Sequence, residues 1–356
     1  MTNEVTMDYK ISILSGDGVG RQLAQSAVDI LSAVGLRFSH EFKYFYPLIG
    51  GVAIEHTGIG LPQDTIDLCA KSDAILLGAC GGAKWMDPYG FDTAKKSVMQ
   101  LMYALNLFLE VTPIVLSSHL KNLSPLKNKL LKDNTVFIIK ESRAGTLRGE
   151  HGLRTTKYGE QAYSTETITI QEIERIAKSA YELARFKKLP IVSVDMADKT
   201  ENGKLWRKIV SKISNAYPET KTTHMLIDEC LFELNNNAEF GIVLTSNLLG
   251  QIVTAHTASL TGAVGSIATA NIGIQSGLYS AYYTNPDSKT PNPIGTILST
   301  ALLLSQSCKL STEAQAVERS VQKVLQSHFP ESLGGNVSST KFTELVSLEI
   351  LNYKDN

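Results

Sequence analysis

The chain has 356 residues, of which 43% are hydrophobic, so it is long enough to bury a substantial core and to fold as two lobes. Its 34 Lys and Arg residues nearly balance its 35 Asp and Glu residues, so no overall field favours nucleic acid or an anionic membrane. The N-terminus lacks an apolar signal segment, and no apolar run approaches the roughly 20 residues that a membrane span requires. The four cysteines follow no metal-ligand or redox spacing. We therefore expect a cytoplasmic protein that binds neither nucleic acid nor membrane.

Strand-like and helix-like segments alternate along the chain. The opening YKISILSGDGVG predicts a buried strand, a glycine-rich turn and then a helix from about Arg21 to Val34. Residues 170–186 carry apolar side chains at helical spacing. Continuous apolar runs, typical of parallel strands that are covered on both faces, occur at residues 73–79, 135–139, 191–194 and 240–244. This alternation predicts an α/β architecture, whereas the polar stretch from 149 to 169 is interpreted as an extended arm or loop.

Three glycines form the turn that follows the first predicted strand. Gly16, Gly18 and Gly20 resemble the start of a dinucleotide-binding fingerprint, but GxGxxG requires glycine at position 21, which is Arg21. No acidic residue follows in the strand-end context that a ribose-binding residue would need. By itself the turn is therefore weak evidence for a nucleotide site.

Five short motifs occur in order along almost the whole chain. They are GDGVG at residues 16–20, GACGGAKW at 78–85, KLWR at 204–207, HM followed by Asp228, and TSNLLG at 245–250. Together they resemble the isopropylmalate and isocitrate dehydrogenases, the β-decarboxylating dehydrogenase family, and are most similar to 3-isopropylmalate dehydrogenase. The family motifs read roughly G-D-G-I-G, G-A-V-G-G-P-K-W, L-W-R, H-M-Y-V-D and T-E-N-L-F-G.

This resemblance implies a two-domain α/β fold with a mixed, mostly parallel sheet running through both domains. The first domain is expected to combine residues 1–113 and 263–356, and the second to span residues 114–262. The second domain would carry the arm, at about 149–169, and the helices of a dimer interface. A homodimer whose clefts are shared between subunits follows from the same resemblance.

The resemblance also implies a lysine and a tyrosine that transfer protons, and neither is present at its matched position. The lysine of the family pattern V-D-K-A-N-V corresponds to Met196, and we match the tyrosine after the arm to Ile168. A thioether and an alkyl group carry no proton at any pH. Lys199 lies three residues beyond Met196, across the predicted end of a strand. We therefore expect no intact catalytic residue.

Three aspartates bind a divalent metal in the family, because Mg²⁺ and Mn²⁺ prefer carboxylate oxygens. Asp228 is retained, whereas the other two positions hold Gln251 and Ala255. His256 is adjacent, but one residue along a helix turns a side chain by about 100°, so we do not expect it to replace a ligand. The sequence therefore predicts that no metal is bound.

In the family, three arginines hold the substrate carboxylates, since a guanidinium pairs with a carboxylate through two hydrogen bonds. The stretch from Leu101 to Pro113 lies where the family reads L-R-K-x-x-x-L-F-x-N-L-R-P, and the two arginine positions hold Met102 and Thr112. Arg143 matches the third arginine. Binding of a dicarboxylate is therefore expected to be weaker by orders of magnitude.

The adenosine-binding loop of the family, H-G-S-A-P-D-I-A-G-K, has a shorter counterpart in this chain. After Tyr279 the sequence reads SAYYTNPDSKTPNPIG, and only Asp287 offers a counterpart to the loop aspartate. Asp198 replaces the asparagine that contacts the nicotinamide in the family. The family implies NAD and Mg²⁺ or Mn²⁺ as cofactors, but we expect both sites to be lost and no cofactor to bind.

These replacements lead to one principal functional hypothesis and two alternatives. We expect a catalytically inactive homologue that acts as a binding or regulatory homodimer, for which an unknown small molecule is a possible ligand. One alternative is an enzyme with rebuilt, metal-free chemistry in the same cleft, using Arg143, Asp198, Asp228 and His256. For this alternative the apolar replacements predict a less charged, more hydrophobic substrate. The other is an active NAD(P)-dependent 2-hydroxy-acid dehydrogenase with an altered substrate.

Overall fold

The computed structural model describes residues 8–117, 120–126, 134–145, 148–236 and 240–354. The chain divides into two compact units, of which unit 1 comprises Met1–Leu107 and Ala263–Asn356 and unit 2 comprises Phe108–Gly262. The first division follows Leu107 rather than residue 113, because β4 (Leu109–Leu116) pairs along its whole length with β5 (Asn134–Glu141) of unit 2. None of the described helices is both long enough and apolar enough to cross a bilayer.

The described part of unit 1 has five strands in the order β2–β1–β3–β12–β11, in which β11 and β12 are antiparallel and the other pairs are parallel. The strands are β1 (Asp8–Gly16), β2 (Glu41–Phe45), β3 (Ala74–Ala79), β11 (Ala268–Ile272) and β12 (Gly277–Ala281). The helices are α1 (Gly20–Phe38), α2 (Gly51–Thr57), α3 (Gln63–Ala70), α4 (Lys96–Ala104), α9 (Ile294–Gln306), α10 (Ser311–Leu325) and α11 (Ser339–Leu351), with short 3-10 turns η1 (Ala83–Trp85), η4 (Val264–Ser266) and η5 (Glu331–Leu333).

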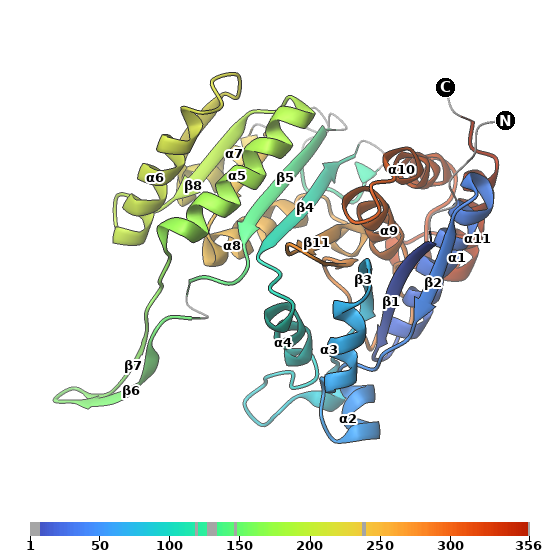
Figure 1. Cartoon of the computed structure of the whole chain (residues 1–356), viewed down its shortest axis with the longest axis horizontal. Helices are drawn as coiled ribbons and strands as arrows, with labels where there is room; N and C mark the ends of the chain where they lie inside the picture. The colour runs from blue at the N-terminus through green and yellow to red at the C-terminus, as the bar shows by residue number, and fades with distance from the viewer. Residues whose placement is uncertain (1–7, 118–119, 127–133, 146–147, 237–239, 355–356) are drawn as a thin grey trace. The chain divides into compact units, whose positions relative to one another are not determined.

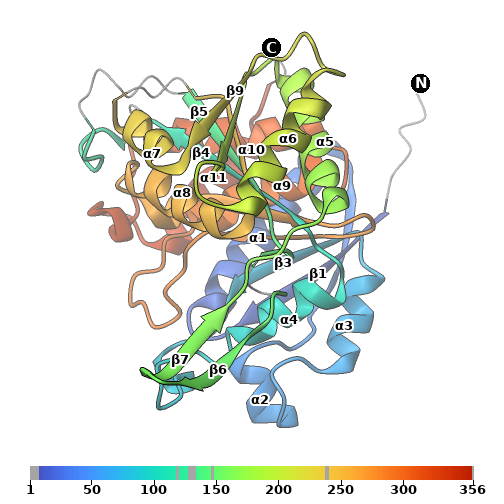
Figure 2. The same ribbon diagram turned by 90° about the vertical axis from the view of Figure 1, so that its left-hand side faces the viewer.

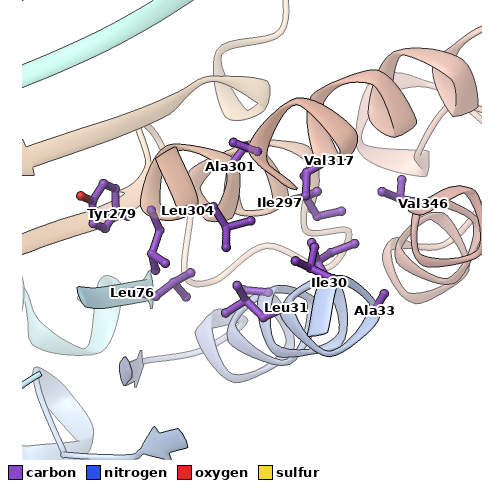
Figure 3. Close-up of a cluster of buried hydrophobic side chains, with 14 of the residues drawn as sticks. Ile30, Leu31, Ala33, Leu76, Tyr279, Ile297, Ala301, Leu304, Val317 and Val346 are labelled. Carbon is purple, nitrogen blue, oxygen red and sulfur yellow. The ribbon is translucent and has the colours of Figure 1, made fainter. Parts of the chain in front are cut away.

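The main core of unit 1 joins the two ends of the chain. Figure 3 shows Ile30 and Leu31 of α1 beside Ile297 and Leu304 of α9, and all four side chains are completely buried. Burying an aliphatic side chain of this size stabilises the fold by about 1.5–3 kcal/mol. Residues that lie more than 260 positions apart in the sequence therefore form one structural unit.

The main sheet of unit 2 has five described strands in the order β4–β5–β10–β8–β9, in which β4 is antiparallel to β5 and the other pairs are parallel. Figure 1 shows α5 and α6 side by side over this sheet, where both helices bury apolar side chains in one cluster. The remaining strands are β8 (Ile191–Asp195), β9 (Thr222–Leu226) and β10 (Ile242–Thr245), and the helices are α5 (Ile170–Lys187), α6 (Glu201–Ser214), α7 (Ile227–Asn236) and α8 (Asn247–Ser259). The predicted fold class, α/β with a mixed and mostly parallel sheet in both domains, is confirmed.

The stretch interpreted from sequence as an arm or loop forms an antiparallel hairpin. β6 (His151–Thr156) and β7 (Gly159–Ser164) pair in register over their whole length, and Figure 2 shows them as a separate two-stranded ribbon. Every residue of β7 is exposed. Regular strands were not predicted here because a ribbon that is exposed on both faces needs no alternation of apolar and polar residues. An isolated hairpin is only marginally stable in water, so this ribbon should gain stability from a second surface.

Candidate functional site

Polar side chains gather where the parallel strands of unit 2 end. Lys140 of β5, Thr245 of β10 and Asp195 of β8 lie at the carboxyl ends of neighbouring strands. In open α/β sheets, ligands bind in the crevice beyond these ends. This edge of unit 2 is therefore the first candidate site.

Met196 and Ile168 line the same small cavity beyond the end of β8. The cavity measures about 20 Å³, which is enough for roughly one water molecule. Ile168 also packs against the hydrophobic cluster beneath α5 and α6. The structure therefore brings together the two positions that the resemblance assigns to proton transfer, and neither side chain carries a proton. The other lining residues are Glu166, Val194, Asp195, Thr200, Asn202, Gly203, Trp206, Ser246 and Leu249.

The carboxylate of Asp195 fixes the turn that carries Met196. It is almost completely buried and accepts hydrogen bonds from Arg207 Nε at 2.9 Å, from Arg207 Nη2 at 2.8 Å and from Ala197 N at 2.9 Å. The hydrogen bonds to Asp195 raise the pKa of Arg207 above its ordinary value, although burial opposes this shift. The ion pair is therefore the charged anchor of this part of the site, and the sequence analysis did not identify it.

His224 lies beside this ion pair, half-buried, with Nε2 at 2.8 Å from Ser211 Oγ. Burial lowers the pKa of His224 below 6.5 and Arg207 lowers it further, whereas Asp195 acts in the opposite direction. The folded protein therefore binds this proton less tightly than the unfolded chain does. By linkage, the contribution of His224 to stability is complete above pH 6.5 and is lost as the pH falls towards the lower folded pKa.

We expect acid destabilisation to decrease when His224 is replaced with glutamine. Between pH 7 and pH 5 the free energy of unfolding should fall less steeply in His224→Gln than in the unmodified protein, by at most about 1.4 kcal/mol per pH unit. Urea unfolding at several pH values measures this slope. His56→Gln, which removes an exposed imidazole, is the matched control. Identical slopes in the protein and in His224→Gln would contradict the assignment.

A second ion pair in unit 2 was also missed, and it is more deeply buried than the first. Lys140 Nζ lies 2.9 Å from Glu110 Oε2, with side-chain exposures of 8% and 12%. Glu110 and Lys140 are direct cross-strand partners on β4 and β5. Glu110 and Lys140 are visible in the sequence as opposite charges, but their pairing depends on the strand register, which the sequence does not give.

Arg143 lies on the turn that follows β5. Its backbone N–H donates to Glu141 Oε2 at 2.7 Å, and the same carboxylate also accepts from the backbone of Ala144. Glu141 is completely buried and pairs with Arg175, whose guanidinium lies 4.3 Å from the centre of the Phe108 ring. The backbone at Arg143 is therefore held by a buried carboxylate at the same edge of the sheet.

The three positions assigned to metal ligands lie on two helices of unit 2 that contact each other. Asp228 is exposed in the first turn of α7, where its Oδ1 accepts a hydrogen bond from Glu229 N. Gln251 and Ala255 are exposed on α8, one turn apart, and Gln251 Nε2 donates to Asn247 Oδ1 at 3.4 Å. Among the described residues, no three His, Cys, Asp or Glu side chains of one chain are placed to hold a metal.

Met102 and Thr112, the two positions assigned to substrate arginines, are packing positions in this structure. Met102 lies against a hydrophobic cluster of unit 1, and Thr112 is completely buried on β4 of unit 2. The two residues belong to different units. Of the three predicted carboxylate-binding positions, Arg143 therefore supplies the guanidinium.

In unit 1, the short loop after β12 closes on the glycine turn. Val19 N donates to Pro286 O at 2.9 Å, and Ala83 N donates to Asp287 Oδ2 at 2.8 Å. Gly18 has φ of 53°, and a Cβ at this position would lie 2.0 Å from Pro286 O, so only glycine allows this approach. Asp287, the residue that offers a counterpart to the loop aspartate of the family, is thus part of the contact between the loop and η1.

A cavity of about 730 Å³ lies beside this loop and the first turns of α1. No local sequence pattern predicts this cavity, because the loop and α1 are more than 240 residues apart in the chain. It occupies the part of unit 1 where the resemblance places the adenosine loop. Its lining residues are Gly18, Val19, Arg21, Gln22, Gln25, Ser26, Asp29, Pro286, Asp287, Ser288 and Thr340.

Comparisons with known proteins agree in sequence and in fold. Residues 10–346 match the family model described as "Isocitrate/isopropylmalate dehydrogenase". The 3-isopropylmalate dehydrogenase of Geobacillus kaustophilus is 34% identical over 97% of this chain and 96% of its own length, and that of Moorella thermoacetica is 36% identical over 89% and 90%. The structure of a β-decarboxylating dehydrogenase from Thermococcus kodakarensis covers 98% of this chain and 100% of its own, at 23% identity with a TM-score of 0.81.

The expectation that no cofactor binds is wrong in the light of these comparisons. It rested on the shortened loop and the replaced aspartates, but the relatives that align over most of their length are dehydrogenases. A dehydrogenase transfers hydride to an acceptor, and in this family the cofactors are NAD and a divalent metal. The loop after β12 is shorter than the family motif, but in the structure its residues still line a cavity beside α1.

Proposed function

This chain belongs to the isocitrate/isopropylmalate dehydrogenase family, and we propose that it is a homodimeric binding or regulatory member that does not carry out oxidative decarboxylation. Its nucleotide site is proposed to lie in the cavity beside the glycine turn. The single observation that carries the loss of chemistry is the environment of Met196.

Met196 occupies the matched position of the proton-transferring lysine, and its surroundings leave no room for a substitute. A Cβ on Gly203 would lie 2.6 Å from the Met196 carbonyl carbon, so α6 packs directly against this backbone. The cavity that Met196 lines holds about one water. Lys199, the next lysine along the chain, is exposed and lies 3.5 Å from Asp198. The pairing of Lys199 with Asp198 on the surface therefore supports the proposal that Lys199 does not replace the family lysine.

The cavity of unit 1 supports nucleotide binding. Arg21, Gln22 and Gln25 offer hydrogen-bond donors, and Asp287 and Ser288 offer acceptors, along a space large enough for part of a dinucleotide. When bound, NAD would supply a hydride acceptor. The residues of this chain would only orient it, because the proton-transfer positions of unit 2 are apolar.

The homodimer is supported by the exposed apolar side chains of α7 and α8. Phe232 is 67% exposed, and Leu248 and Ile252 are 41% and 44% exposed on adjacent turns of α8. Clustered apolar groups of this kind usually mark an interaction surface. A second copy of the chain would cover them in a symmetric contact.

We expect the purified protein to bind nucleotide without turning over the substrates of the family. No reduction of NAD or NADP should occur with Mn²⁺ and 3-isopropylmalate, isocitrate, malate or tartrate, whereas calorimetry should give saturable nucleotide binding. Asp287→Ala should weaken that binding, and Asp64→Ala, an exposed change elsewhere in unit 1, should not. Sedimentation velocity on the same sample should give a dimer. Metal-dependent turnover well above the rate without enzyme would refute the proposal.

A second candidate is an active dehydrogenase with an altered substrate. The identity of 34–36% to 3-isopropylmalate dehydrogenases favours it. It requires a proton-transferring group other than residue 196. Turnover with a less acidic 2-hydroxy acid, abolished by Asp287→Ala, would support this candidate over the first.

A further inference from the structure

Lys140 is an unusual residue for the interior of a sheet. Among the residues that the structure describes, it is the only lysine in the buried class, with 6% of its surface exposed. Its aliphatic stem fills the space beside Gly250, where an added Cβ would lie 2.5 Å from Lys140 Cβ. Desolvating an ammonium is costly, and here the compensation comes from the carboxylate of Glu110 at 2.9 Å. The helix and the strand are thus built around one buried ion pair.

The pair lies on the strand face that the resemblance assigns to carboxylate recognition. Glu110 opposes Lys140, and Thr112, two residues further along β4, opposes Ile138, so Glu110 and Thr112 point to the same face. Thr112 is the matched position of a substrate-binding arginine. The family pattern F-x-N-L-R-P reads F-L-E-V-T-P here. On this face the chain has therefore lost a positive charge and gained a negative one.

We propose that Glu110 is a built-in occupant of an anion site, and that its carboxylate excludes acidic ligands from Lys140. This inference rests on the proposed function and specifies the ligand class: the site takes a ligand that is neutral or weakly acidic where the family substrate carries a second carboxylate. A dicarboxylate would meet the charge of Glu110 and find Lys140 already neutralised. Discrimination of this kind comes from a repulsive group as much as from a lost attraction.

Removing the Glu110 carboxylate should convert Lys140 into a free anion site. In Glu110→Ala, removal of the carboxylate should leave space beside Lys140 for a small carboxylate. Sodium propionate should raise the melting temperature of this variant saturably, relative to equal concentrations of sodium chloride, because a ligand of the folded state stabilises it by mass action. The same variant should bind 3-isopropylmalate at least about tenfold more tightly than the unmodified protein, a difference of about 1.4 kcal/mol.

Two further variants separate this effect from general destabilisation. Glu201→Ala removes the partner of Lys204 at 2.6 Å on the surface, and it should show no saturable response to propionate. Glu110→Ala/Lys140→Met removes both charges, which avoids an unpaired buried ion, and its response should also be absent. If Glu110→Ala does not fold, Glu110→Gln keeps the side-chain volume and is tested with 3-isopropylmalate in its place.

The proposal is overturned if propionate or 3-isopropylmalate stabilises the Glu110 variants no more than it stabilises Glu201→Ala. It is also overturned if the unmodified protein binds 3-isopropylmalate as tightly as the Glu110 variants do. Failure of the proposed function has a different signature, which is metal-dependent NAD reduction by the unmodified protein. The two outcomes are therefore measured in separate assays.

Discussion

Replacing Asp17 with alanine should lower the free energy of unfolding of unit 1 by about 3–5 kcal/mol. The Asp17 carboxylate is buried and accepts three backbone hydrogen bonds, from Gly51 N at 2.9 Å, Val52 N at 2.8 Å and Gly81 N at 2.7 Å. A hydrogen bond to a charged group contributes about 1.5–3 kcal/mol, and a buried N–H left without a partner adds a desolvation cost. The change should therefore loosen the start of α2 and the turn before η1 together.

Trp85 gives a direct measurement of this change. The backbone of Gly51 lies against the Trp85 ring, since a Cβ at Gly51 would be 2.0 Å from it. In a Trp206→Phe background, urea unfolding followed by tryptophan fluorescence reports unit 1 alone. Asp29→Ala, which removes an exposed carboxylate bonded to Gln25, should change stability by less than about 0.5 kcal/mol. A loss below about 1 kcal/mol for Asp17→Ala would show that the three hydrogen bonds are dispensable.

Replacing Asp195 with alanine should lower the free energy of unfolding of unit 2 by about 2–4 kcal/mol. The substitution removes both hydrogen bonds to Arg207 and the bond from Ala197 N. Arg207 is 37% exposed at its side chain, so its freed charge can reach water, and the loss should be smaller than for a fully buried pair. The turn that carries Met196 should become more mobile as well.

Trp206 reports this change in a Trp85→Phe background, because its Nε1 donates to Ser193 Oγ on β8 at 3.1 Å. Asp198→Ala is the matched control, since Asp198 is exposed and pairs with Lys199 at 3.5 Å. Its effect should be within about 0.5 kcal/mol. Equal effects of Asp195→Ala and Asp198→Ala would rule out a structural role for the buried pair.

The cofactor expectation shows where the sequence argument failed. It treated the absence of the HGSAP core after Tyr279 as the absence of a site. A loop motif encodes the contacts of one particular backbone, however, so the absence of the motif does not exclude a cofactor site. The contacts of the shorter loop depend on residues far away in the sequence, since Asp287 accepts a hydrogen bond from Ala83 N, 204 residues away.

The arm shows a second reason why an element could not be predicted from the sequence. Residues 149–169 have no sustained period, so neither helix nor strand was predicted, yet β6 and β7 pair in register. Both faces of this ribbon are largely exposed, and no burial pattern was therefore needed to encode it. By contrast, the helix predicted at residues 170–186 corresponds to α5, because its buried stripe has to recur at helical spacing.

The sequence by itself determined the family, the α/β class, the positions of the buried strands and the chemical identity of Met196 and Ile168. These properties depend on local patterns or on side-chain chemistry, and both can be recognised from the sequence without knowledge of the fold. The tertiary structure alone decided that Lys140 meets Glu110, that Asp195 anchors the Met196 turn through Arg207, and that the short loop lines a cavity. These contacts depend on strand register and on helix packing, and both arise from the burial of apolar surface that lies far away in the chain.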